Sequence, residues 1–452
     1  MSEGAHDTLI AGPARRPLSG KVIVPGDKSI SHRTIILASL AGGISEIHGF
    51  LPGEDNLATA RMFEQMGVRI EWLNETKTRL RIHGVGLHGL KQPEGMLDAG
   101  NSGTCARLMA GVLAGQSFTS TVTGDASLRK RPMRRITEPL RRMGAQIEGR
   151  DGDGRDGGNL LPLSIEGGSL KGIHHVSKIA SAQVKSCILL AGLYAEGETR
   201  VREPKPSRDH TERMLPLFGQ PLHILDDGSI SLKPTGELTA PNHPIHIPAD
   251  PSSATFFAVA AGIVEGSEIR MDGIGINPRR DGWRRILGDM GAAISVENES
   301  AVGEEPVADI SVCHDAMNGI HVNPDDIADA IDEFPALFVA AALADGEFIL
   351  EEAEELRVKE SDRIAAMATA LSACGATVQE QACGLRIQGH GQLTGGVTID
   401  ARGDHRIAMA MAVAAQRATD EITIQHAGAI ATSFPDFVPL AQAIGMNVRW
   451  VA

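Results

Sequence analysis

The chain has 452 residues, of which 42% are hydrophobic and 22% are charged. These proportions are ordinary for a folded globular protein and exclude an intrinsically disordered chain. The net charge of −14 argues against a protein whose main partner is nucleic acid, because such proteins present a basic surface.

Neither export nor membrane insertion is indicated. Residues 1–20 contain no apolar stretch long enough for a signal peptide. The longest apolar run, 336–344, is much shorter than a membrane span. Five cysteines occur without a CxxC pair, which favours reduced thiols. We therefore expect a cytoplasmic protein without a membrane partner.

A helical pattern that ends at a glycine and continues into a short strand occurs six times, at intervals of about 75 residues. The six glycines are Gly67, Gly144, Gly219, Gly291, Gly375 and Gly445. Glycine tolerates the left-handed backbone that often ends a helix, so each is predicted to be the residue that follows a helix.

An apolar, alanine-rich helix running into a strand precedes each of these glycines by about 35 residues. The six copies are 33–47, 106–122, 184–201, 254–269, 336–350 and 407–424. One such unit is too small and too apolar to stand alone, so the units must share cores. Two groups of three units fit the size of single cores, with crossings near 24–27 and 246–250. The sequence thus predicts one domain over 26–246 and a second over 1–25 and 247–452.

Polar and charged residues collect just ahead of the helices. Those at the apolar helices are 28–33, 101–104, 181–183, 250–253, 332–333 and 404–406, and the second helices are expected to begin with 130–132, 208–210, 277–280 and 359–363. Helix N-termini attract anions, so a cleft lined by these segments would bind phosphates and carboxylates. Ordinary helix capping also explains 250–253. A solvated charged helix face is the alternative for 277–280 and for 359–363. We expect no metal and no cofactor, because His174 and His175 have no ligand partner at helical spacing.

Eight motifs occur in order along essentially the whole chain. They are PGDKSISHR (25–33), NSGT (101–104), KRP (130–132), SAQVKS (181–186), RDHTE (208–212), DEFP (332–335), LRVKESDRI (356–364) and DHRIAMA (404–410). Together they resemble the 5-enolpyruvylshikimate-3-phosphate (EPSP) synthase family. The resemblance implies an α/β fold: a two-domain inside-out α/β barrel of six βαβαββ repeats, three per domain. Its active site would lie in the interdomain cleft.

The same resemblance implies that the enolpyruvyl group of phosphoenolpyruvate passes to the 5-hydroxyl of shikimate 3-phosphate, with release of phosphate. The expected shikimate 3-phosphate contacts are Lys28, Ser29, Arg33, Ser181, Ala182, Gln183, Arg208, Asp332 and Lys359. The expected phosphoenolpyruvate contacts are Lys28, Asn101, Gly103, Arg131, Gln183, Arg363 and Arg406. Asp332 and Glu360 would carry the two protons, with Lys28 assisting, because addition to an enol needs both a base and an acid.

Two positions distinguish this chain within the resemblance. Thr432 stands where many relatives have a lysine, which makes the sequence similar to the divergent bacterial subgroup called class II. Gly103 is kept where glyphosate-tolerant relatives have alanine, so glyphosate is expected to inhibit. Family precedent also implies a monomer.

Two other functions remain open from the residues. One is transfer of the enolpyruvyl group to UDP-N-acetylglucosamine, but the cysteine that such enzymes carry on a basic loop has no counterpart here. The other is a non-catalytic anion-binding protein. Such a protein has no use for Asp332 and Glu360, because carboxylates repel anionic ligands.

Overall fold

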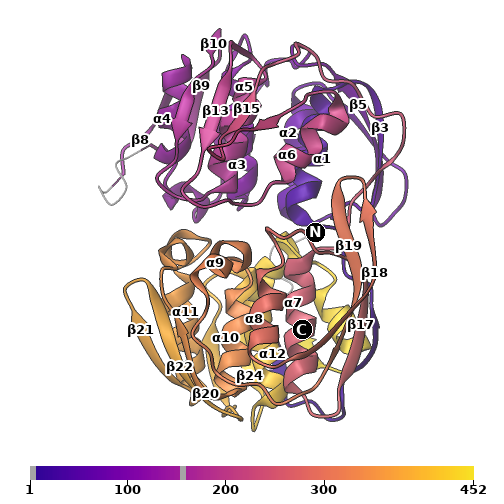
Figure 1. Ribbon diagram of the computed structural model, residues 1–452, viewed down its shortest axis with the longest axis vertical. Helices are drawn as coiled ribbons and strands as arrows, with labels where there is room; N and C mark the ends of the chain where they lie inside the picture. The colour runs from indigo at the N-terminus through magenta and orange to yellow at the C-terminus, as the bar shows by residue number, and fades with distance from the viewer. Residues whose placement is uncertain (1–6, 153–158, 452) are drawn as a thin grey trace. The chain divides into compact units, whose positions relative to one another are not determined.

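The computed structural model describes residues 7–152 and 159–451, and the fold is mixed α/β. The chain divides into two compact units, each with its own hydrophobic core (Figure 1). The central unit is Lys28–Ile247, and the split unit combines Met1–Asp27 with Pro248–Ala452.

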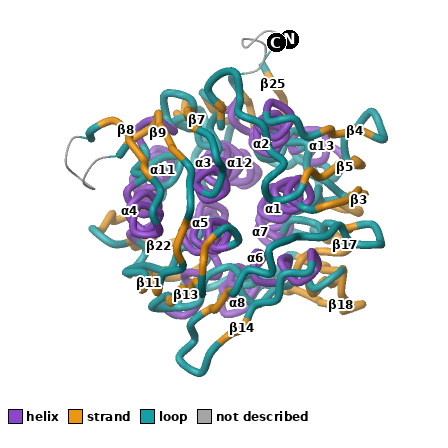
Figure 2. The backbone as a smooth tube through the Cα atoms, turned by 90° about the horizontal axis from the view of Figure 1, so that it is seen from above, coloured by secondary structure: helices purple, strands orange, loops and turns teal. Residues whose placement is uncertain are grey.

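Three helices form the centre of the central unit. They are α1 (Lys28–Leu40), α3 (Gly103–Ala114) and α5 (Ala182–Gly192), and most of their residues are buried. Helices that are apolar on all sides must be buried in this way. Figure 2 shows strands of this unit on the outside of these helices. The other helices of the unit are α2 (Glu54–Gln65), α4 (Arg134–Met143) and α6 (His210–Met214).

The sheets of the central unit repeat one pairing order: a parallel pair followed by two antiparallel strands. In that order they are β16 (Ile245–His246), β3 (Gly42–His48), β5 (Arg79–Val85) and β4 (Arg69–Trp72); β6 (Leu97–Asp98), β7 (Thr119–Thr123), β9 (Leu160–Glu166) and β8 (Gln146–Arg150); and β11 (His174–Val176), β13 (Thr199–Arg202), β15 (Ile230–Leu232) and β14 (His223–Ile224). A parallel pair is also formed by β10 (Leu170–Lys171) and β12 (Ala195–Glu196). In β9, buried Leu161, Leu163 and Ile165 alternate with more exposed residues, as expected of a strand with one face on a core.

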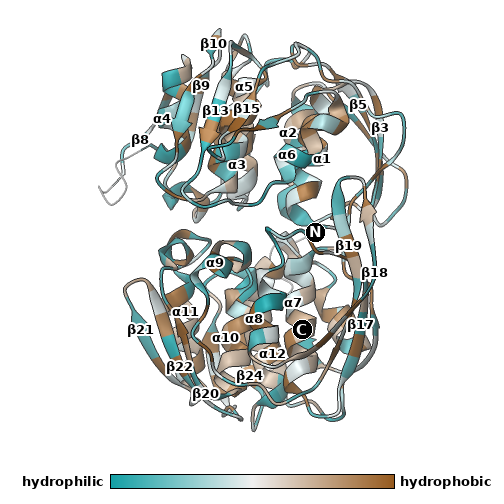
Figure 3. Ribbon diagram, viewed as in Figure 1, coloured by the Kyte–Doolittle hydropathy of each residue, from teal (hydrophilic) through white to brown (hydrophobic). Residues whose placement is uncertain are grey.

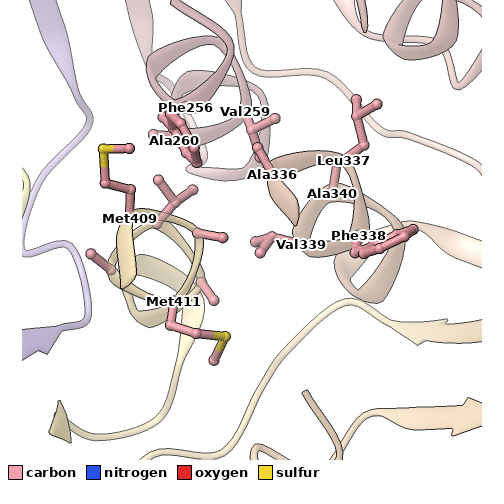
Figure 4. Close-up of a cluster of buried hydrophobic side chains, with 14 of the residues drawn as sticks. Phe256, Val259, Ala260, Ala336, Leu337, Phe338, Val339, Ala340, Met409 and Met411 are labelled. Carbon is pink, nitrogen blue, oxygen red and sulfur yellow. The ribbon is translucent and has the colours of Figure 1, made fainter. Parts of the chain in front are cut away.

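The split unit is also built on three apolar helices, α7 (Pro251–Ile263), α10 (Phe334–Leu343) and α12 (His405–Ala414). Figure 4 shows Val259 and Ala260 of α7, Ala336 and Val339 of α10 and Met409 of α12 in one buried cluster. Small alanine side chains let the helix backbones approach closely. In Figure 3, α10 is coloured as hydrophobic, whereas the short helix α9 (Pro324–Ile327) is hydrophilic.

Two sheets of the split unit repeat the pairing order of the central unit. They are β23 (Val397–Asp400), β24 (Ile422–Gln425), β1 (Leu9–Gly12) and β25 (Asn447–Trp450); and β2 (Ser19–Val22), β17 (Glu268–Gly275), β19 (Glu305–Cys313) and β18 (Ala293–Val302). A third sheet joins β20 (Asp345–Leu350), β22 (Gly384–His390) and β21 (Thr377–Gln381), and parallel bridges from Asn318 and His321 extend it at β20. The other helices are α8 (Gly282–Asp289), α11 (Arg363–Ala373) and α13 (Phe437–Ala443).

The helix-ending glycines are confirmed. All six of them have a positive φ, from 82° at Gly219 to 116° at Gly144. Each follows a helix and precedes a strand, as at Gly291 between α8 and β18. A residue with a Cβ is disfavoured in this conformation, which explains the choice of glycine.

The predicted starts of the apolar helices are also confirmed. Ser102, Asp250 and Asp404 cap α3, α7 and α12 with their side chains. For the second helices the prediction is confirmed at two positions, because α6 begins at His210 and α11 at Arg363. It was wrong at the other two, because α4 begins at Arg134 and α8 at Gly282, beyond 130–132 and 277–280. Among the described residues, no helix is both long and apolar enough to cross a bilayer.

Candidate active site

The expected site residues divide between the two units. In the central unit, Lys28 is the first residue of α1, and its side chain is only 15% exposed. The Lys28 ammonium lies 2.5 Å from the Asp55 carboxylate of α2. Asn56 donates a hydrogen bond to the Lys28 carbonyl at 2.9 Å, so α2 fixes both ends of this residue.

Arg33 lies one turn further along α1 and is buried. Its guanidinium donates to the hydroxyls of Thr211 and Ser186, both at 2.7 Å, and to the Ser29 carbonyl at 3.0 Å. Ser186 and Thr211 are themselves joined at 2.7 Å. Arg33 therefore ties α1 to α5 and α6, and it holds Ser29 at the start of α1.

A second group surrounds the start of α3. Arg131 donates to the Asn101 amide oxygen at 2.7 Å, and Asn101 donates to Asp125 at 2.6 Å. Gly103 is the first residue of α3, and a Cβ added to it would lie 2.8 Å from the tip of Arg107 and 3.4 Å from the tip of Arg131. Asn101, Gly103 and Arg131 are thus neighbours, although 30 residues separate the first from the last.

Gln183 joins this group through a residue that the sequence analysis missed. Arg107 donates to the Gln183 side-chain oxygen at 2.5 Å, and Gln183 donates to Thr104 at 2.9 Å. Arg107 lies one helical turn after Gly103, on the same face of α3. That spacing was the available signal.

Ser181 and Ala182 form the start of α5, and Arg208 lies just ahead of α6. Ser181 is the N-cap residue of α5, but its side chain makes no capping hydrogen bond. Its backbone N–H instead donates to the Glu203 carboxylate at 2.8 Å. Glu203 also pairs with Lys185, a buried lysine that the sequence analysis did not select.

In the split unit, Arg363 gathers carboxylates from three segments. Its guanidinium donates to Asp332 at 3.0 Å, to Glu360 at 2.6 Å and to Asp404 at 2.9 Å. The Arg363 side chain is 1% exposed. Burial by itself lowers the pKa of Arg363, but the three carboxylates raise it overall. Asp332 and Glu360, the two expected proton carriers, are thus held by neighbouring nitrogens of one cation.

The remaining cations of this unit lie around Asp332. The Lys359 ammonium is 3.4 Å from the Asp332 carboxylate. Arg406 donates to the Asp332 backbone carbonyl at 2.7 Å, and its own backbone N–H is capped by Asp404. The motifs predicted that Asp332, Lys359, Glu360, Arg363 and Arg406 lie in one site. The structure brings these five residues together.

A buried ionic cluster beside this group was also missed. Arg280 donates to Asp27 at 2.9 Å, to Asp250 at 3.0 Å and to the Ser252 hydroxyl at 2.7 Å. Ser252 in turn donates to Glu333, the residue after Asp332. Residues 250–253 thus do more than cap α7, because they also bind Arg280. Arg280 is buried in these contacts and is not part of the solvated charged face that was the alternative for 277–280.

Thr432 lies at the end of a 3₁₀ turn, Ala427–Thr432, and its hydroxyl donates to the Ala429 carbonyl at 2.7 Å. Its side chain thus hydrogen-bonds to the local backbone and supplies no cation.

Over residues 7–152 and 159–451, no cluster of three or more His, Cys, Asp or Glu side chains is arranged to hold a metal ion.

Comparison with known proteins adds to this geometry. A model of the EPSP synthase (3-phosphoshikimate 1-carboxyvinyltransferase) family matches residues 13–440. A 3-phosphoshikimate 1-carboxyvinyltransferase of Methylococcus capsulatus is 53% identical over 98% of this chain and 99% of its own length. One of Hydrogenovibrio crunogenus is 52% identical over 96% of each chain.

Solved structures agree with these relatives. An EPSP synthase from Acinetobacter baumannii superposes with a TM-score of 0.85 at 47% sequence identity. The alignment covers 98% of this chain and all of that one. The match of fold, length and sequence leads to one conclusion: this chain belongs to the EPSP synthase (3-phosphoshikimate 1-carboxyvinyltransferase) family.

Proposed function

We propose that this chain transfers the enolpyruvyl group of phosphoenolpyruvate to the 5-hydroxyl of shikimate 3-phosphate and releases phosphate. Relatives that are 52–53% identical over nearly the whole chain carry the name of this activity, which supports the proposal. The structural observation that carries the proposal is the placing of two carboxylates, Asp332 and Glu360, beside Arg363, with Lys359 next to Asp332. The reaction needs two such groups for its two proton transfers.

The reaction proceeds by addition and elimination. The substrate hydroxyl adds to C2 of the enol while C3 gains a proton. The tetrahedral intermediate then loses a C3 proton and expels phosphate. Asp332 accepts the hydroxyl proton and Glu360 serves C3, with Lys28 assisting. Arg363 supports these roles because it holds both carboxylates in place.

Anion recognition is divided between the units. Ser29, Arg33, Ser181, Ala182, Gln183, Arg208 and Lys359 hold shikimate 3-phosphate together with Lys28 and Asp332. Asn101, Gly103, Arg131, Arg363 and Arg406 hold phosphoenolpyruvate together with Lys28 and Gln183. The hydrogen bonds from Arg131 to Asn101 and from Arg107 to Gln183 support a preformed phosphoenolpyruvate group.

The two compact units are the two domains, each composed of three βαβαββ repeats in an inside-out α/β barrel, and the substrates bind in the cleft between the domains. The recurrence of one strand-pairing order in the sheets supports the repeats. The division after Asp27 and after Ile247 supports domain boundaries close to residues 26 and 246.

The protein works as a monomer in the cytoplasm. Glyphosate inhibits it by binding in the place of phosphoenolpyruvate.

The test is phosphate release from phosphoenolpyruvate by the purified protein. One reaction contains shikimate 3-phosphate and a parallel one contains UDP-N-acetylglucosamine. Release with shikimate 3-phosphate alone is expected. Release with the nucleotide sugar would move the assignment to the sister transferase. Binding of both phosphorylated ligands without any release would leave an anion-binding protein.

A further inference from the structure

A buried lysine in the central unit has no role in the proposed reaction. Lys185 lies on α5, one turn after Ser181, and its side chain is 2% exposed. Its ammonium lies 2.9 Å from the Glu203 carboxylate and 2.8 Å from the Glu212 carboxylate, and it donates to the Ser207 carbonyl at 3.3 Å. An ammonium has three hydrogens, so these partners satisfy it completely.

Buried ion pairs are costly to desolvate and contribute little to stability compared with apolar residues of similar size. A buried lysine between two carboxylates therefore calls for a reason other than stability. Burial by itself lowers the pKa of Lys185, but Glu212 and Glu203 raise it overall, which favours a charged lysine. Burial also raises the pKa of Glu212, so that this carboxylate depends on Lys185 for its charge.

The partners of this cluster are the segments that carry the acceptor-binding residues. Glu203 accepts the Ser181 backbone N–H at 2.8 Å and the Ser207 hydroxyl at 2.8 Å. Arg208 follows Ser207 directly. The cluster thus clamps the start of α5 to the segment that ends at Arg208.

Glu212 extends the connection to α1. It follows Thr211, which accepts a hydrogen bond from Arg33 at 2.7 Å. Lys185 precedes Ser186, the other hydroxyl partner of Arg33. A shift of Lys185 against α6 would therefore move the partners of Arg33 as well.

We propose that Lys185, Glu203 and Glu212 are positioning residues that set the affinity for shikimate 3-phosphate by holding Ser181, Arg208 and Arg33, without touching the substrate themselves. The inference rests on the proposed function, because it assumes that these three residues bind shikimate 3-phosphate. It assigns a much smaller effect on phosphoenolpyruvate, because Gln183 is the one expected phosphoenolpyruvate contact on α5, whereas Asn101 and Arg131 have a separate hydrogen-bond network.

The experiment uses Glu203→Gln with Glu198→Gln as its matched control. Glu203 follows the end of β13, and Glu198 precedes its start and pairs with the exposed Arg200. Glutamine keeps the shape but weakens the bonds to Lys185 and Ser181. Binding of shikimate 3-phosphate in the absence of phosphoenolpyruvate is measured for each protein, followed by kcat and both KM values and by thermal unfolding.

We expect Glu203→Gln to weaken shikimate 3-phosphate binding by about tenfold or more, because misplaced binding groups lose affinity steeply. The KM for phosphoenolpyruvate should change less than about twofold, within measurement scatter. Equal shikimate 3-phosphate affinity in the two variants would overturn the inference. So would equal increases in both KM values, because they would show that the cluster supports the site as a whole and not shikimate 3-phosphate binding in particular.

If Glu203→Gln does not fold, Lys185→Arg decides the question. The planar guanidinium keeps the charge but cannot match the three partners of an ammonium. Weaker shikimate 3-phosphate binding with unaltered phosphoenolpyruvate KM supports positioning, and unaltered affinity overturns it. Failure of the wild-type protein to bind shikimate 3-phosphate would overturn the proposed function, and this inference with it. If the wild-type protein binds shikimate 3-phosphate and the variants bind it equally well, the proposed function stands and only the positioning role is overturned.

Discussion

The two proposed proton carriers, Asp332 and Glu360, share one guanidinium, that of Arg363. Asp332 and Glu360 accept hydrogen bonds from the two terminal nitrogens of Arg363, and Asp404 accepts one from its Nε. This arrangement lowers the cost of holding two carboxylates close together, because like charges repel strongly where water is excluded. It also means that Arg363 keeps a buried partner when either proton carrier is neutralised.

Neutralising either proton carrier should therefore abolish catalysis without unfolding the protein. We expect Asp332→Asn and Glu360→Gln each to reduce the rate of phosphate release by at least about 100-fold, the usual contribution of a positioned acid or base. Glu380→Gln in the same unit is the control, since Glu380 is exposed and pairs with the half-buried Arg357. Near-normal activity in either active-site variant would remove that carboxylate from the mechanism.

A second residue-scale prediction concerns Gly103. Its φ is not in the left-handed region, so alanine fits the backbone, but the added Cβ would lie 2.8 Å from the tip of Arg107. Arg107 would have to move away from Gln183. We expect Gly103→Ala to raise the inhibition constant of glyphosate by about tenfold or more, and the KM for phosphoenolpyruvate by less.

Inhibition assays at several phosphoenolpyruvate concentrations would measure both constants. Gly288→Ala is a suitable control, because Gly288 is helical and open space surrounds its Cβ. A wild-type enzyme that resists glyphosate at low phosphoenolpyruvate would contradict this prediction from the start.

The connection from helix through glycine to strand recurs along the chain, and at each copy the glycine adopts the left-handed backbone conformation that ends the helix. Helix α8 offers a matched pair of glycines. Gly291 follows the helix with φ of 97°, and its Cβ would lie 3.3 Å from the Ala316 carbonyl. Gly288 lies inside the same helix, exposed and with an ordinary helical φ.

We expect Gly291→Ala to lower the free energy of unfolding by about 1–2 kcal/mol, because an L-residue is strained in the left-handed region. Gly288→Ala should raise it by about 0.5–1 kcal/mol, since alanine is the better helix former. Urea denaturation of the two variants would measure both changes. Changes of the same sign would show that the helix-ending conformation does not govern the choice of glycine.

For the whole molecule, the net charge of −14 contrasts with the cations collected in the proposed site. Clustered cations repel one another in the absence of an anion. We therefore predict that shikimate 3-phosphate draws the two units together. The radius of gyration from small-angle scattering should fall when shikimate 3-phosphate is added, and stay constant with shikimate alone. Identical scattering curves with and without shikimate 3-phosphate would contradict closure.

A whole-molecule prediction of a different kind concerns assembly. Size-exclusion chromatography with light scattering should give the monomer mass of 47.8 kDa at all protein concentrations. A mass that rises with concentration would identify a self-associating protein instead.

Local structure, and the positions of the expected site residues along the chain, could be predicted from neighbouring residues and from the motifs. The glycines after helices, the capping residues Ser102, Asp250 and Asp404, and the apolar helices depend on neighbouring residues, and the structure confirmed them. The family motifs placed the expected site residues, and the matches to relatives confirmed the family. The roles of those residues remain predictions.

Which charged side chains meet could not be predicted in this way, because it depends on how the whole chain packs. Arg280 and Asp27 are 253 residues apart in sequence, and Arg107 and Gln183 are 76 apart. Nothing in local propensity or periodicity encodes such pairs, because they form only when packed helices bring their ends together. The Lys185 cluster was missed for the same reason. In the sequence, Lys185 is the single charged residue of a largely apolar helix. Its two carboxylates come from segments whose position depends on the fold of the whole unit.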